Sequence, residues 1–365
     1  MTAAASHATT ETVTVADERL QVTCPAPRDV WSELLDQDPL SLVTQSPGWL
    51  DARCRLGGFQ DASRLYRRED GRTLVLPMVR RRPLTGRLAL QSSFAEGWGV
   101  GGPVAAGGIT WEDIALVAGD LVGRPAVRTL VRPNPLLADE WEAAAGPSVL
   151  AVPRLAHVLD LAGGFDEVWR GRFTQSARAN VRRAEKAGIT VERGSSPEHV
   201  SAFYRLHDRS LERWALQQHE PLWLARLRRR RRDPLRKFHL LAQTLGDAFA
   251  VWLASLDGRP VAATIVLRGA NAQYTRGAMD AAVAGPTRAN YLLHATAIRD
   301  ASEAGCRHYH FGETGSSRSL AFFKSRFGAE ARPYAEYRFE RLPLTAVDRR
   351  LRGAVKRVVG FVDPT

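Results

Sequence analysis

One lysine near the C-terminal end of the chain stands in a setting suited to acyl transfer. Lys324 follows Phe322 and Phe323 and precedes a Phe-Gly turn at 327–328. When an amine attacks an ester, a tetrahedral oxyanion forms, and a fixed cation beside it is worth ~100-fold or more in rate. We therefore predict that Lys324 supplies this charge, while the two phenylalanines exclude water and position it. The alternative is a lysine that merely caps a loop, because Phe-Lys pairs are common.

Two expected strands upstream of this lysine carry further polar side chains. Side chains alternate along a strand, so Tyr274 and Arg276 should share one face of the strand 272–276. Arg276 could clamp a phosphate or a carboxylate, whereas Tyr274 could equally be structural, because strands favour aromatic residues. Glu313 ends the expected strand 308–313 and is a candidate general base for the amine's proton. Proton transfer by the substrate itself is the alternative.

Several familiar mechanisms have no support in the sequence. Cys306, His308 and His310 share a strand face, but no clear further ligand accompanies them, so no metal site is predicted. Neither a Gly-x-Ser-x-Gly elbow nor a Walker loop occurs. The segment 284–291, Ala-Gly-Pro-Thr-Arg-Ala-Asn-Tyr, lacks the glycines that cradle a pyrophosphate, although Arg288 could help bind an anion at a helix start.

Arginine-rich stretches predict contacts with polyanions. The helix expected over 176–187 places Arg178, Arg182 and Lys186 on one stripe, opposite apolar residues. The run 226–232 is denser and could bind a nucleic-acid backbone through charge alone. Solvated helix faces are the alternative for both stretches. The candidate nucleic-acid contacts in the run are Arg228, Arg229, Arg230, Arg231 and Arg232.

The composition indicates a two-domain, strongly basic protein. A chain of 365 residues exceeds the ~250 to 300 residues at which a single hydrophobic core stops growing. Lysine and arginine number 51 against 39 acidic residues, and the net charge of +12 attracts RNA, anionic lipid or phosphorylated substrates. A GC-rich genome is the alternative source of the arginines. Three scattered cysteines, no leader-like N-terminus and no run of ~18 apolar residues together favour the cytoplasm.

The expected elements alternate between helices and strand hairpins, which indicates a mixed α/β fold. Asp70-Gly71 and Asp257-Gly258 each join two apolar strands, so the chain could be a duplicated fold. Ser176 is the expected N-cap of the first basic helix, and a strand is expected to begin at Phe238. We predict a disordered N-terminus over 1–17, an N-terminal domain over 18–153, a C-terminal domain over 154–342 and a basic C-terminal helix over 343–365 that could touch anionic lipid.

Two of these stretches resemble a known family. The string from Ser176 to Ile189, and the segment from Phe311 to Ala329 with its Phe-Lys pair, resemble the second domain of the Fem-type aminoacyl-tRNA-dependent transferases and of related acyltransferases with the GNAT fold. The resemblance implies mixed sheets in two tandem GNAT-like domains. It also implies that Tyr274 lines the cleft for donor and acceptor, that Phe323 and Lys324 lie near the tRNA-borne ester, and that Arg178 and Arg182 lie near a phosphate-bearing substrate.

The sequence therefore predicts an acyltransferase that moves an amino acid from aminoacyl-tRNA to an amino group of a small molecule or a peptidoglycan precursor. Aminoacyl-tRNA would be its co-substrate, and it would need no metal or bound cofactor. Acyl-CoA enzymes of this fold carry a glycine-rich loop where 284–291 lies, and its absence disfavours acyl-CoA. One alternative is an acyl-CoA-dependent N-acyltransferase of natural-product or polysaccharide biosynthesis, and another is a non-catalytic RNA- or membrane-binding protein.

Overall fold

The chain divides into two compact units, and the mixed α/β class that the sequence predicts is confirmed. The computed structural model describes residues 8–81, 89–94, 98–315, 317–348 and 350. The first unit contains the described residues up to Arg154 together with Pro333–Leu344, and the second contains Leu155–Arg332 and the described residues from Thr345 onward. The chain passes between the units within β10 (Leu150–Asp160) and again within β16 (Glu330–Glu340). Pro153, the last residue of the predicted N-terminal domain, therefore lies inside a strand.

The first unit combines strands and helices. One sheet has the order β1-β2-β4-β5-β8, with the bounds Thr9–Val15, Glu18–Cys24, Arg64–Arg68, Thr73–Leu76 and Val104–Ala105. In another sheet β16 is followed by β9 (Arg128–Val131), β7 (Leu90–Ser93), β6 (Val79–Arg81) and β3 (Phe59–Asp61). The helices are α1 (Arg28–Gln37), α2 (Pro47–Leu56), α3 (Trp111–Gly123) and α4 (Ala138–Ala144), with 3-10 turns at Val43–Gln45 and Pro135–Leu137.

The N-terminal segment contains a strand where the sequence predicted disorder over 1–17. β1 pairs antiparallel with β2, from Thr9 opposite Cys24 to Val15 opposite Glu18. Six of the seven residues of β1 are threonine or valine, and such β-branched side chains suit a pleated strand. Val15 packs against the core of the unit. The prediction was wrong because the threonines were interpreted only as polar residues. Residues 1–7 lie outside the described residues.

The last strand of the first unit comes from the far end of the chain. β16 pairs antiparallel with β9, and the ring of Tyr337 stacks on Trp141 with 4.8 Å between centroids. Next to it, the buried carboxylate of Glu336 accepts a hydrogen bond of 3.0 Å from Nε of Arg132. Residues that follow the segment Leu155–Arg332 of the second unit in sequence thus contribute to the core of the first.

In the second unit the strands have the order β11-β12-β13-β14-β15-β10. Their bounds, apart from β10, are Thr190–Gly194, Phe249–Leu256, Arg259–Arg268, Ala272–Met279 and His308–Glu313. Neighbours are antiparallel except β14 and β15, which are parallel. The expected turn between β12 and β13 is present, with φ of 50° at Asp257 and 75° at Gly258, as a tight hairpin requires.

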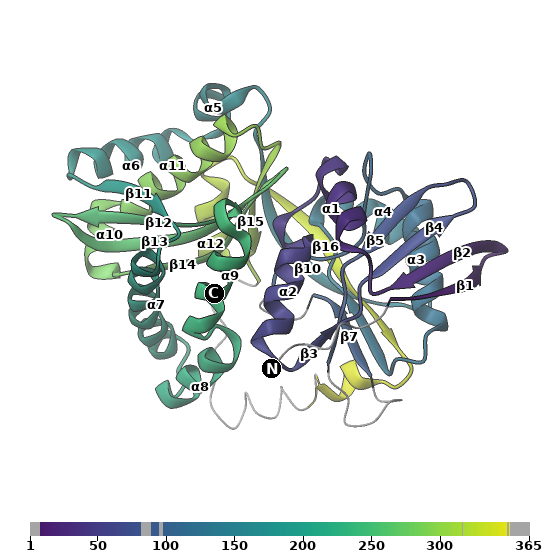
Figure 1. The fold of residues 1–365 in the computed structure, drawn as a ribbon. Coiled ribbons are helices and arrows are strands. Elements are labelled where there is room, and N and C mark those ends of the chain that lie inside the picture. Colours follow the sequence, from purple (N-terminus) through teal and green to yellow (C-terminus); the bar gives the residue numbers. More distant parts are fainter. Residues whose placement is uncertain (1–7, 82–88, 95–97, 316, 349, 351–365) are drawn as a thin grey trace. The chain divides into compact units, whose positions relative to one another are not determined.

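Helices cover both faces of this part of the sheet. α11 packs on one face with α6 beside it, and α7 packs on the other (Figure 1). α5 continues into a π-helical turn. The bounds are α5 (Gly164–Glu167), the π-turn (Val168–Arg172), α6 (Gln175–Lys186), α7 (Pro197–Gln217), α8 (Leu222–Arg232), α9 (Leu235–Leu245), a 3-10 turn (Gly246–Ala248), α10 (Ala281–Thr287), α11 (Ala289–Glu303) and α12 (Arg318–Ser325).

Two local predictions for this unit are wrong. Thr174 caps α6 instead of Ser176, because its hydroxyl accepts a hydrogen bond of 3.2 Å from the amide of Ala177. The strand expected to begin at Phe238 is part of α9. Phe238 and Leu241 are both buried and lie three positions apart, which is the spacing of one helix face.

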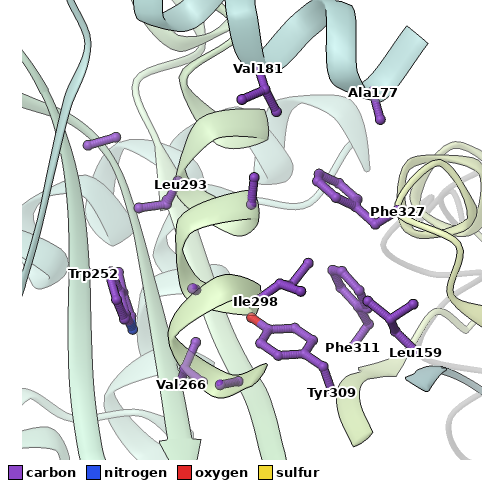
Figure 2. Packing of buried hydrophobic residues seen from close by; sticks show 14 of the residues in the cluster. Leu159, Ala177, Val181, Trp252, Val266, Leu293, Ile298, Tyr309, Phe311 and Phe327 are labelled. Carbon is purple, nitrogen blue, oxygen red and sulfur yellow. The ribbon is translucent and has the colours of Figure 1, made fainter. Parts of the chain in front are cut away.

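Large buried side chains hold α11 against β15. Figure 2 shows Ile298 of α11 beside Tyr309 and Phe311 of β15, with Phe327 close to α6. This core keeps the central strands and the helix above them in a fixed relation. Its members include Leu159, Ala177, Val181, Trp252, Val266, Leu293, Ile298, Tyr309, Phe311 and Phe327.

Of the basic helix expected over 343–365, residues 344–348 are helical, and residues 351–365 lie outside the described part of the chain. Within the described ranges, no helix has both the length and the apolar character needed to cross a bilayer.

Candidate active site

The central parallel strands of the second unit separate after a short paired stretch. β14 and β15 pair only at Ala272 with Tyr309 and at Gln273 with His310. Beyond these pairs, β14 continues alongside β13 and β15 continues alongside β10. The facing edges of the two strands therefore leave the ladder at the position of Tyr274. Of the residues that the sequence selected for chemistry, Tyr274 of β14 and Glu313 at the end of β15 flank this point of separation.

Lys324 is buried at the end of β15. It lies on α12, only 1% of its surface is exposed, and its Nζ donates hydrogen bonds to the carbonyl oxygens of Gly312 (2.8 Å) and Glu313 (2.9 Å). Burial lowers the pKa of Lys324 to about 7, while the charge of Glu313 acts to raise it. The sequence predicted a fixed cation at this position, and the structure adds that backbone carbonyls engage two of the three N–H donors of the ammonium.

Two histidines that the sequence analysis missed lie near Lys324. His157 of β10 and His294 of α11 are both buried. Burial lowers the pKa of each ring, to about 3 for His294, and the charge of Lys324 lowers both further. In neither ring does Nδ1 have a hydrogen-bond partner among the described residues. Both imidazoles are therefore neutral at physiological pH. A histidine on the apolar face of the helix 289–303 was the only signal that could have found His294.

Tyr274 reaches the same region from β14. Its ring meets the ring of His294 edge-on, with centroids 5.1 Å apart. Its hydroxyl lies directly over Gly277, where an added Cβ atom would come within 2.4 Å of it. Burial raises the pKa of Tyr274 to about 12, and the charge of Arg276 only partly opposes this. The phenol is therefore protonated and able to donate a hydrogen bond.

The two phenylalanines before Lys324 have different surroundings. The ring of Phe323 packs against Tyr291, His294 and Phe327, at centroid distances of 5.3, 5.4 and 5.2 Å. Phe322 is 60% exposed, and the guanidinium of Arg326 lies over its ring. Only Phe323 therefore lies in an aromatic wall, and the expectation that Phe322 excludes water is wrong, because α12 turns it outward.

Arg276 does not share a face with Tyr274. The β13–β14 ladder shifts register between Ile265 and Val266, so Thr275 is an extra residue and strict alternation is lost. Arg276 pairs instead with the buried carboxylate of Asp233, at 3.0 Å from Nη2 and 3.2 Å from Nε. Because this ion pair engages the guanidinium, the structure does not support the predicted role of Arg276 as a substrate clamp.

The carboxylate of Asp233 forms ion pairs with two cations, Arg276 and Lys237. Nζ of Lys237, on the first turn of α9, donates a hydrogen bond of 2.9 Å to it. Burial would raise the pKa of Asp233, but the charges of Arg276 and Lys237 lower it well below its usual range. Burial lowers the pKa of Lys237 to about 7. This buried cluster connects α9 to β14.

The remaining predicted substrate contacts are scattered. Nη1 of Arg178 donates to the carbonyl oxygens of Trp169 (3.0 Å), Arg170 (3.0 Å) and Phe173 (2.6 Å), so it braces the π-helical turn. Arg182 is exposed on α6. Arg288 is exposed between α10 and α11, with a φ of 63°.

The arginine run is partly neutralised. Arg228 pairs with Glu220 at 2.7 Å. Arg229 pairs with Asp208 at 2.5 Å, and its guanidinium lies 4.4 Å from the ring centroid of Tyr204. Arg230, Arg231 and Arg232 are exposed.

Comparison with known proteins identifies the class of this fold. Residues 171–325 match the family described as acetyltransferase (GNAT) domain. The crystal structure of FemX is similar with a TM-score of 0.63 at 13% identity, over 88% of this chain and 98% of that chain. A conserved protein of unknown function from Bacteroides thetaiotaomicron has a TM-score of 0.51 at 11% identity, over 91% of this chain and 99% of its own. No curated protein matches the sequence.

The second unit therefore contains a GNAT-type acetyltransferase domain, as the sequence predicted. The similarity in fold to FemX extends over most of the chain, which agrees with the expected two-domain arrangement. The protein is therefore an acyltransferase of the GNAT fold.

Proposed function

We propose that this acyltransferase takes an aminoacyl group from aminoacyl-tRNA and joins it to an amino group of a small molecule or a peptidoglycan precursor. One observation supports aminoacyl-tRNA over acyl-CoA as the donor. Between β14 and α11, where an acyl-CoA enzyme of this fold has a glycine-rich loop, the chain forms α10, with Pro286 inside it and Arg288 in the left-handed region after it. Such a segment lacks the row of glycine amides that would cradle a pyrophosphate.

The residues around the separation of β14 and β15 support the chemistry of amide formation. The acceptor nitrogen attacks the ester carbon, a C–N bond forms and Glu313 takes the amine's proton. The third N–H donor of Lys324 is assigned to the oxyanion of the tetrahedral intermediate. As the C–O bond breaks, Tyr274 gives its proton to the ribose oxygen and later regains one from solvent.

The donor is tested by offering charged tRNAs and acyl-CoAs separately. We expect labelled amino acid to leave tRNA and appear in an amide with an amine acceptor. Ribonuclease treatment of the charged tRNA should abolish transfer, and transfer that survives it would contradict the proposal. Lys324→Met should transfer far more slowly, whereas Arg19→Met, which removes an exposed cation on β2 of the first unit, is the control and should leave the rate unchanged.

A second candidate is an acyl-CoA-dependent N-acyltransferase, because the matched family is described as an acetyltransferase domain. A ligand at 100 times its Kd stabilises a folded protein by ~2.7 kcal/mol. A clear rise in Tm with acetyl-CoA, together with intact charged tRNA after incubation, would favour this candidate. The absence of any rise with acetyl-CoA or longer thioesters, together with deacylated tRNA, would favour the first.

A further inference from the structure

α7 leads into α8 at one end of the second unit (Figure 1). Large apolar side chains are exposed at this corner. Leu216 in the last turn of α7 is 79% exposed, Trp223 in the first turn of α8 is 68% exposed, and Leu227 is 40% exposed. The inner side of this corner is already packed, since Ala215 and Ala225 are buried together. The exposed residues thus lie on the outer side and are not used by the fold of this unit.

On the outer face of α8, exposed apolar residues lie between exposed arginines. Trp223 and Leu227 are four positions apart and therefore lie on one face of the helix. At 3.6 residues per turn, Arg230 borders this face on one side and Arg231 on the other. Both arginines are exposed. An apolar centre bordered by cations is the pattern of helices that lie in a membrane interface.

We propose that this face of α8, with Leu216 beside it, docks on the surface of an anionic lipid bilayer. Trp223 and Leu227 enter the boundary between headgroups and acyl chains, and Arg230 and Arg231 meet lipid phosphates. The net charge of +12 adds long-range attraction to such a surface. This inference is independent of the donor, because it rests on residues outside the candidate active site.

The composition of the face favours a bilayer over RNA. An RNA backbone is bound by cations, and its bases stack on aromatic rings or guanidinium planes, but leucine offers neither interaction. Two of the three exposed apolar residues at this corner are leucines. Moreover, Arg228 and Arg229 of the same helix are paired with acidic residues, so the density of available charge is lower than the sequence indicates.

The test is sedimentation of the full chain with vesicles of phosphatidylcholine alone or mixed with phosphatidylglycerol. We expect binding only to the mixed vesicles. Trp223→Ser should weaken it on the order of tenfold, and Arg230→Gln by about fivefold. Trp111→Ser is the matched control, because Trp111 is also exposed (54%) but is followed by Glu112 and Asp113. Unchanged Tm values show that both tryptophan variants are folded.

Three results would overturn the proposal. The first is equal binding to neutral and mixed vesicles, or to neither. The second is an equal loss of binding in Trp223→Ser and Trp111→Ser. The third is binding of tRNA that Trp223→Ser weakens as much as it weakens vesicle binding, which would assign the face to RNA.

Discussion

Gly277→Ala tests whether the hydroxyl of Tyr274 has to lie where it does. Gly277 is on β14 and is not in the left-handed region, so alanine is compatible with its backbone. A Cβ atom there would come within 2.4 Å of the Tyr274 hydroxyl oxygen and within 3.2 Å of Cζ. The added methyl group therefore acts on the position of one phenol more than on the fold.

The size of the effect follows from the distance. Ordinary contact for a Cβ atom begins at 3.4 Å, so the hydroxyl has to move by about 1.0 Å, which is 3.4 minus 2.4. A misplacement of ~1 Å at a reacting group costs ~100-fold in rate. Tyr274→Phe removes the proton donor altogether and should cost ~100-fold or more. The double variant should be no slower than Tyr274→Phe, because both changes remove the same function.

The assay is the initial rate of acyl transfer from the donor identified by deacylation, measured beside the Tm of each variant. Gly123→Ala is the matched control, since a Cβ atom there meets nothing within 4 Å among the described residues and the residue is helical, in α3 of the first unit. It should keep the wild-type rate. A wild-type rate in Gly277→Ala, or a double variant that loses the product of the two single effects, would refute the role given to Tyr274.

Three further predictions concern stability. Lys324 has a pKa of about 7 in the folded protein and an ordinary value of 10.5. Between these values the unfolded chain binds more protons, so the unfolding free energy rises with pH, by at most about 1.4 kcal/mol per pH unit. Lys324→Met should show a smaller rise in urea titrations from pH 7 to 10, and an identical rise would contradict the lowered pKa of the buried amine. Asp233→Asn takes the carboxylate away from the buried Lys237 and the partly buried Arg276 and should lower the unfolding free energy by ~3 kcal/mol, whereas Asp166→Asn, in an exposed pair, should leave it unchanged. Thr174→Ala should cost ~1 kcal/mol by removing the N-cap, and Ser176→Ala should cost little; equal losses in thermal unfolding would argue against the assigned cap.

The sequence was sufficient for the features that depend on local chemistry. Asp257-Gly258 predicted a hairpin because only a few residue types accept two consecutive positive φ angles, and the structure has that turn. The Phe-Lys pair and the basic helix over 176–187 indicated a GNAT-like domain by resemblance, and the family comparison agrees.

The sequence was not sufficient where distant parts of the chain decide the outcome. Tyr274 and Arg276 were placed on one face by strict alternation, but a register shift opposite Ile265 separates them. Lys324 was predicted to be a fixed cation, but nothing in the neighbouring sequence shows that the carbonyls of Gly312 and Glu313 accept hydrogen bonds from its amino group. Such partners are set by tertiary packing, which no local pattern records.

The first unit is discontinuous in sequence, and this has a consequence for its synthesis. Its strand partner for β9 and the Tyr337 ring that covers Trp141 emerge only after the segment Leu155–Arg332 of the second unit has been translated. At ~5–20 residues per second, the ribosome needs roughly 10 to 35 s to pass from Arg154 to Pro333. During that interval the nascent first unit presents an uncovered strand edge and an indole without its stacking partner, so chaperones have a defined window in which to bind it.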